Sequence, residues 1–150
     1  MKKRISTILI LGIFFFQNSY SQISLGSQTS TSIKVDQDIN FTDGAATNTI
    51  TLSGVNIETT GTVTFSNAKV FLIDSKIKCN KIIFTNATDL SISKAVDISS
   101  HFIIFPSKSI ALSGSGSGAE LLLSYKSPFQ SLNCAIQPSP DFSIVIKKVL

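Results

Sequence analysis

The side chains best suited to covalent or acid–base chemistry in this chain are two cysteines and one histidine. They are Cys79, Cys134 and His101. The cysteines could form a disulfide in an oxidising compartment, and the histidine could act as a general acid or base. A zinc site is not predicted, because the sequence has no CxxC pair and no second histidine. No GxSxG motif occurs and no acidic residue has a spacing that would pair it with His101, so we expect a solvated histidine without a catalytic role.

The N-terminal segment has the three-part pattern of a secretory signal peptide. Two lysines and an arginine precede an apolar run at 5–16, which is too short for a membrane span of about 20 residues. We predict a signal peptide at 1–21 that is cleaved after Ser21; the alternative is an uncleaved N-terminal anchor. The short leader is typical of a bacterial protein and predicts a secreted or cell-surface location, in the periplasm or outside the cell.

The charge of the chain depends largely on this leader. The formal net charge of +4 falls to +1 without it, since ten lysines then face nine acidic residues. No cluster of basic residues is left to bind a nucleic acid. We therefore expect no nucleic-acid partner, and no stable membrane span after cleavage.

Four phenylalanines recur at intervals of 24, 19 and 21 residues, each at the end of a short stretch with alternating apolar side chains. No window shows sustained helical periodicity, so the predicted class is all-β. Two further series of alternating stretches keep step with the phenylalanines. The phenylalanines are Phe41, Phe65, Phe84 and Phe105; the second series is 50–52, 71–73, 90–92 and 110–112; the third is 55–57, 77–79 and 96–98.

Three short strands in each repeat of about 20 residues predict a single parallel β-helix, a solenoid of about four to five coils. Each coil buries its apolar side chains by stacking on its neighbours, which places the four phenylalanines in one interior ladder. A β-sandwich with evenly spaced strands is the alternative. We assign 22–127 to the β-helix and 128–150 to a C-terminal tail or cap, in which "FSIVIKKVL" forms one more strand, antiparallel or at the sheet edge.

The phrase "FSNA" at 65–68 returns as "FTNA" at 84–87, which indicates that the chain turns the same corner once per coil. Asn and Asp suit such a corner, because they tolerate left-handed backbone geometry. We expect a polar ladder there that ends at the fourth coil, where a proline follows the phenylalanine. The members of this ladder are Asp43, Asn67 and Asn86.

Cys79 is in phase with the inward positions of its strand and aligns with Ile98. This placement favours a buried free thiol, which behaves as a small apolar side chain. A disulfide between Cys79 and Cys134 stays open as the alternative.

The pattern resembles right-handed parallel β-helix proteins, among them the filamentous-haemagglutinin-like adhesin stalks and the scaffold of polysaccharide lyases. The resemblance covers residues 31–125 and is one of architecture, without a signature motif. It implies either an adhesin-like structural module or an enzyme that acts on acidic polysaccharide.

The enzyme hypothesis needs residues that the sequence does not group together. Lyases on this scaffold use a basic residue beside calcium-binding carboxylates, and hydrolases use paired carboxylates. Beyond the leader the chain has no arginine, and its acids are scattered. Asp74 and Asp89 are expected at corners, and Asp97 is expected to face outward beside Lys78 of the preceding coil, as a surface ion pair. We therefore predict a protein that is not an enzyme and has no cofactor and no metal site.

The outward side of the phenylalanine strands carries Thr64, Ile83 and Ile104 in succession, with Phe102 nearby at a strand start. These four residues form a candidate interaction strip, because a contiguous apolar area on a polar surface usually binds something. The tail of the chain, which we favour, or a second molecule would cover it. The predicted function is a secreted, non-enzymatic structural or adhesin-like surface module. The alternative is a carbohydrate-binding module or, with less support, a polysaccharide-active enzyme. Its partner is not identified; a glycan or another surface protein would fit.

Overall fold

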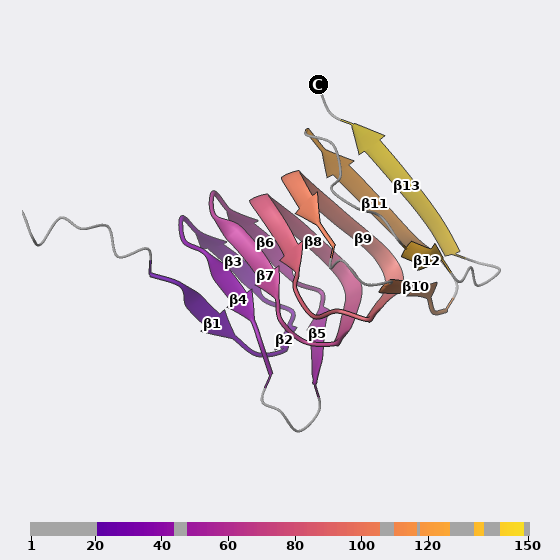
Figure 1. The fold of residues 1–150 in the computed structure, drawn as a ribbon, viewed down its shortest axis with the longest axis horizontal. Coiled ribbons are helices and arrows are strands. Elements are labelled where there is room, and N and C mark those ends of the chain that lie inside the picture. Colours follow the sequence, from indigo (N-terminus) through magenta and orange to yellow (C-terminus); the bar gives the residue numbers. More distant parts are fainter. Residues whose placement is uncertain are drawn as a thin grey trace, which may run out of the picture.

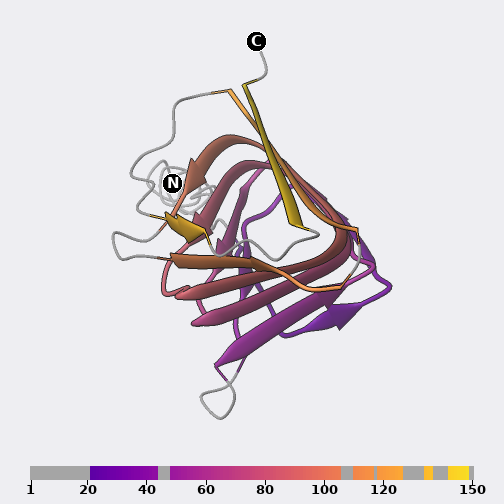
Figure 2. The same ribbon diagram turned by 90° about the vertical axis from the view of Figure 1, so that its right-hand side faces the viewer.

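The computed structural model describes residues 21–43, 48–105, 110–116, 118–126, 134–136 and 142–148. Every described strand pairing is parallel, and the strands stack into a solenoid of about four turns. Figure 1 shows the coils side by side along the long axis, and Figure 2 shows the three-sided profile seen along the stack. The prediction of an all-β parallel β-helix is confirmed, and the β-sandwich alternative is wrong.

Each side of the solenoid is a ladder of parallel strands. Face 1 contains the phenylalanine strands, face 2 follows it along the chain, and face 3 completes the coil. Two long strands, β8 (Lys69–Phe84) and β9 (Asp89–Ile104), bend around the corners and contribute to all three faces.

The remaining strands belong to one face each. Face 1 contains β1 (Ile23–Leu25), β4 (Ile39–Phe41) and β7 (Thr62–Phe65). Face 2 contains β2 (Gln28–Thr29), β5 (Thr49–Ser53), β10 (Ile110–Gly114) and β12 (Cys134–Ile136). Face 3 contains β3 (Ser32–Val35), β6 (Asn56–Thr59), β11 (Ala119–Tyr125) and β13 (Phe142–Lys148).

The C-terminal segment adds strands to two of these faces. β12 pairs in parallel with β10, and β13 pairs in parallel with β11 at the end of face 3. The expected position of "FSIVIKKVL" at a sheet edge is confirmed, but an antiparallel orientation is wrong. The physical reason is that the chain continues to wind in the same direction, so each new strand meets its neighbour with the same polarity.

The interior of face 1 is the predicted phenylalanine ladder. The successive rings are stacked with centroids 5.2, 5.1 and 5.3 Å apart and interplanar angles of 16°, 8° and 6°. Phe41, Phe65 and Phe84 are fully buried, and Phe105 is 3% exposed. Aliphatic side chains from the other two faces close the core around these rings.

The second predicted series contains an error of one residue. Val70, rather than Phe71, aligns with Ile50, so Phe71 points outward and is 37% exposed. A slip of one residue exchanges the two sides of a strand. The apolar run at 70–73 alternates equally well in either phase, and stacking on the coil before it decides between them.

Two further alignments are wrong by two residues. On face 2, Leu112 rather than Ile110 aligns with Leu90. On face 3, Ile77 aligns with Ile98, whereas Cys79 aligns with Ser100. A shift of two residues keeps a side chain on the same side of the sheet, so Cys79 still points inward.

Left-handed backbone geometry recurs once per coil at a different corner from the one predicted, between faces 2 and 3. At the predicted corner, Asn48 has a positive φ (46°), whereas the predicted ladder members Asp43, Asn67 and Asn86 do not. Stacking repeats the turn between faces 2 and 3 from coil to coil. The recurring residues are Ser30 (φ 49°), Gly54 (62°), Asp74 (45°), Lys94 (58°) and Gly116 (80°).

The predicted polar ladder between faces 1 and 2 is partly present. Asn67 is buried, and its side-chain oxygen accepts a hydrogen bond from the Asp43 N–H (3.0 Å) while its amide nitrogen donates to the Asp43 carbonyl (3.3 Å). Asn86 is exposed instead and donates to the Ser66 carbonyl at 3.0 Å. The inward position of that coil is taken by Ala87, so the buried side chain at this corner is apolar there instead of polar.

The two corners also differ in length. The connection from face 1 to face 2 varies between coils and comprises 26–27, 42–48, 66–68, 85–88 and 105–109. The connection from face 2 to face 3 is 30–31, then 54–55, then only a bend inside β8 and β9, and then 115–118 between β10 and β11. Through the first four coils, the corner between faces 2 and 3 is therefore the more constant of the two.

Candidate functional site

The structure brings the predicted interaction strip together on the outside of face 1. Thr64, Ile83 and Ile104 are Cα partners on successive coils and therefore form one outward row. All three are half-buried. Phe102 lies in the adjacent row, next to Lys81 of the preceding coil, and is 43% exposed.

The strip becomes more apolar along the stack. Its row begins at Ser24 and continues through Asn40 and Thr64 to two isoleucines. The side-chain oxygen of Asn40 accepts a hydrogen bond from the Ser66 hydroxyl at 2.7 Å. The end nearest the C-terminal coils is therefore the part with the greatest capacity for hydrophobic contact.

The described parts of the tail do not cover this strip. Cys134–Ile136 extends face 2 and Phe142–Lys148 extends face 3, so both segments continue the ladders instead of folding over face 1. The expectation that these segments cover the strip is wrong. Pairing with β10 and β11 lets the backbone N–H and C=O groups of these segments form ladder hydrogen bonds.

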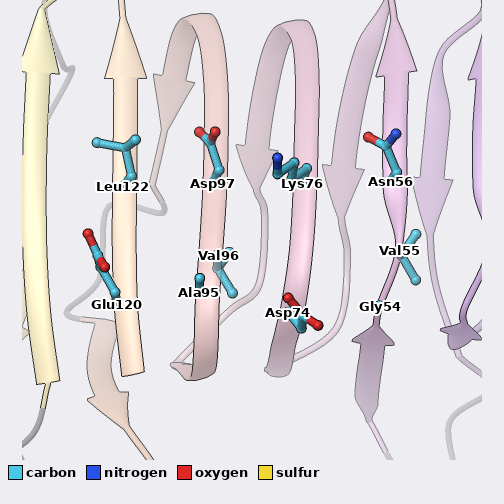
Figure 3. A pocket seen from close by; sticks show the side chains of 10 residues that line it. All are labelled: Gly54, Val55, Asn56, Asp74, Lys76, Ala95, Val96, Asp97, Glu120 and Leu122. Atoms are coloured by element: carbon cyan, nitrogen blue, oxygen red, sulfur yellow. The ribbon is translucent and has the colours of Figure 1, made fainter. Parts of the chain in front are cut away.

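A groove on the outside of face 3 was not predicted. Its cavity has a volume of about 390 Å³, and Figure 3 shows four of its side chains at one level on four neighbouring strands. The ten residues that line it are Gly54, Val55, Asn56, Asp74, Lys76, Ala95, Val96, Asp97, Glu120 and Leu122.

A β-bulge helps to form the groove. The pairing of β8 with β9 shifts between Ile73 and Ser75, so Asp74 faces two residues of the next coil instead of one. Ala95 lies opposite Glu120 in the following pair and has a side chain too small to fill the space. No motif marks this position, because the bulge depends on how two coils of unequal length stack.

The polar side chains of the groove are available to a ligand. Asn56, Lys76 and Asp97 are Cα partners on successive coils, and Asp74 and Glu120 lie near them at the start of the face. Within the described part of the chain, these five side chains make no hydrogen bond or ion pair. The groove therefore offers an amide, an ammonium and three carboxylates over a floor that includes alanine and valine.

The predicted ion pair between Asp97 and Lys78 is wrong. Asp97 aligns with Lys76, and Lys78 binds Glu58 of the preceding coil at 3.2 Å. Glu58 also binds Lys34 at 3.1 Å. The hydrogen bonds from Lys34 and then from Lys78 lower the pKa of the Glu58 carboxyl below its ordinary value of 4.5.

Cys79 is a free, buried thiol, as predicted, and its strand lies on a different face from the strand of Cys134. Burial raises the pKa of Cys79 from 9.0 to about 11, against a smaller opposing effect of the hydrogen bond with Ser100, whose hydroxyl oxygen lies 3.6 Å from the sulfur. A thiol with such a pKa stays protonated near neutral pH and is a poor nucleophile.

His101 is exposed beside this thiol, at a corner as expected. It lines two hollows with Lys78 and Cys79, one of about 480 Å³ and one of about 170 Å³. Among the described residues, no group of three or more histidines, cysteines and acids is placed to hold a metal ion. Over the same ranges, no helix has the length and apolar composition needed to cross a membrane.

Within the described part of the chain, the exposed aromatic side chains do not form a row. Phe71 lies on face 2 and Phe102 on face 1, so they cannot stack on one extended ligand. Comparison with known proteins gave no match, since no protein-family model, no curated protein and no solved structure is significantly similar to this chain.

Proposed function

We propose that this protein is an exported, non-enzymatic surface module of the adhesin-like kind, which binds through the interaction strip of face 1. The observation that supports the proposal is the apolar row of Ile83 and Ile104 beside the exposed ring of Phe102. The described tail strands lie on the other two faces, so the occupant we propose for the strip is a second molecule. The stacked core below the strip keeps it flat and rigid, so little conformational entropy is lost on binding.

An adhesion assay tests this proposal. Beads coated with the exported protein are placed under flow on octyl-coated glass and on bare glass, and the retained beads are counted. We expect retention on the octyl surface that Phe102→Ser reduces by at least about tenfold, because burial of a phenylalanine contributes roughly 1.5–3 kcal/mol.

The matched control is Phe71→Ser, which removes a ring of similar exposure from face 2. It should leave retention unchanged. Equal losses in the two variants, or no loss in Phe102→Ser, would contradict a binding role for face 1.

Carbohydrate binding is the second candidate function, and the groove of face 3 is the observation that favours it. Sugar hydroxyls accept and donate hydrogen bonds, and the groove presents unpartnered groups of both kinds in Asn56, Lys76 and Asp97. The lack of an aromatic row among the described residues removes the stacking contribution that many sugar sites use, so this candidate stands below the first.

A glycan array screened with the exported protein tests the second candidate. Binding should fall at least tenfold in Asp97→Asn combined with Glu120→Gln, because two of the three groove carboxylates become neutral amides of the same shape. Glu58→Gln is the matched control, since it removes a carboxylate of the same face outside this groove. An array without any binding, or equal losses in both proteins, would reject the groove as a sugar site.

A further inference from the structure

The N-terminal end of the solenoid leaves its interior only partly covered. The inward side chains Leu25 and Ile33 of the first coil are half-buried, whereas their partners one coil further, Phe41 and Ile57, are fully buried. Each of β1, β2 and β3 pairs on one side only within the described residues. This end therefore presents apolar side chains together with strand edges that have no partner among the described residues.

The opposite end has the same incomplete pairing on faces 2 and 3. β12 and β13 each have one partner among the described strands, β10 and β11 respectively. β13 is seven residues long, and its Val145 is 42% exposed. Unpaired strand edges of this kind are templates for further pairing.

We propose that the N-terminal end of one molecule stacks on the C-terminal end of a second copy, so that the solenoid continues through both. The match of the two ends carries this inference: both offer faces 2 and 3, and the strands run in the same direction at each step of the stack. Such a head-to-tail contact does not close on itself and gives linear assemblies. Each copy would add about 29 Å, at about 4.8 Å for each of the six strands stacked on face 3.

The register of the ladder predicts which side chains meet at the junction. On face 3, Ile33, Ile57 and Ile77 align, and the same row of Cα partners continues through Ile98 and Leu123 to Ile146. Continuation by one step places the Ile33 of the second copy beside Ile146. One residue further along, Lys34 of the second copy lies beside Lys147.

The two lysines make the junction weak at low ionic strength. Like charges directly opposite each other on neighbouring strands repel, and salt screens this repulsion. Both lysines are exposed, and Lys34 is neutralised in part by Glu58 on its other side. End-to-end association should therefore strengthen as the salt concentration rises.

Analytical sedimentation of the exported protein measures its self-association. The result does not depend on whether the interaction strip or the groove binds a ligand. Between 0.02 and 0.5 M NaCl, wild-type self-association should strengthen about threefold. In Lys147→Glu the new carboxylate faces Lys34, so association at low salt should be about three- to fivefold tighter than in the wild type. It should weaken as salt is added, which reverses the sign of the salt dependence.

Lys81→Glu is the control, since it makes the same change of charge in the middle of the stack, between Thr62 and Phe102. It should keep the wild-type salt dependence. Strictly monomeric behaviour of all three proteins at every salt concentration would overturn the inference. The same response in Lys81→Glu and Lys147→Glu would also overturn it, because net charge rather than the junction would then control association.

Discussion

The inside and the outside of face 1 obey different constraints. Inside, the same residue type recurs at four successive positions, and the rings of Phe41, Phe65, Phe84 and Phe105 stack with almost parallel planes. Outside, the row changes from Asn40 and Thr64 to Ile83 and Ile104. Interior side chains must pack against the coils above and below and against the other two faces, whereas outward side chains border solvent on one side. The repeated residues therefore reflect the requirements of the fold. Functional differences between coils are to be sought in the residues that do not repeat.

The largest expected effect is the loss of one interior ring. Phe84→Ala should lower the free energy of unfolding by about 3–5 kcal/mol, because Phe84 is fully buried and stacked on both sides. Phe71→Ala, on the outside of face 2, should cost less than about 1 kcal/mol. Chemical denaturation of both variants measures the contrast. Similar losses would mean that inside and outside differ less than the geometry indicates.

A second effect belongs to the interior thiol. The pKa of Cys79 is raised in the folded protein, from 9.0 to about 11, so its contribution to stability is complete below about pH 9. This contribution is lost as the pH rises toward 11, because the unfolded chain ionises first. The loss should be about 3 kcal/mol, and it should be missing from the pH dependence of Cys79→Ala. Parallel stability curves for the two proteins between pH 9 and 11 would contradict the buried position.

A third effect concerns the distance between coils. A Cβ atom at Gly61 would lie 2.6 Å from the Asp38 carboxylate and 2.8 Å from the carbonyl group of Gln37, whereas a Cβ at Gly26 would meet nothing within 4 Å. Gly61→Ala should therefore destabilise the protein by about 1–3 kcal/mol. Gly26→Ala should be neutral or slightly stabilising. Thermal unfolding of the pair would sharpen the comparison, and a neutral Gly61→Ala would show that the corner can widen freely.

The smallest effect is expected on the surface of face 3. Glu58→Gln removes the carboxylate that binds Lys34 and Lys78, both of which are well exposed. The melting temperature should fall only slightly at low salt, and the difference should vanish at high salt. Since the pKa of Glu58 is lowered in the folded state, its contribution is present above about pH 4.5 and is lost as the pH falls further. A large, salt-independent loss would assign Glu58 an interior role.

The sequence predicted the part of the fold that the phenylalanines determine. An aromatic ring in the same phase of each coil leaves one register for face 1, so the strip of Thr64, Ile83 and Ile104 was placed correctly. On face 2 the run at 70–73 is apolar throughout, and alternation alone could not decide which side chains point inward. The choice depends on packing against Ile50 of another coil, which a single strand does not reveal.

The groove of face 3 was beyond prediction for a related reason. It depends on the shift between Ile73 and Ser75, where one coil has a residue more than its neighbour, and on the small side chain of Ala95. Both features depend on how neighbouring coils pack against each other, which the sequence of one coil does not reveal. The left-handed corner was missed because Ser30, Asp74 and Lys94 share no residue type, although the backbone repeats the same turn at each of them.

The unequal corners have a consequence for engineering. Between faces 1 and 2 the native chain already accepts connections as different as 66–68 and 42–48 without losing the stacking of Phe41 on Phe65. Foreign peptides grafted into this corner should be displayed at the side of the stack, and one could be inserted for each coil. The corner between faces 2 and 3 is shorter through the first four coils, and it lengthens only at 115–118, where Gly116 keeps the left-handed backbone. A library that varies only the first corner would give multivalent display from a single rigid support.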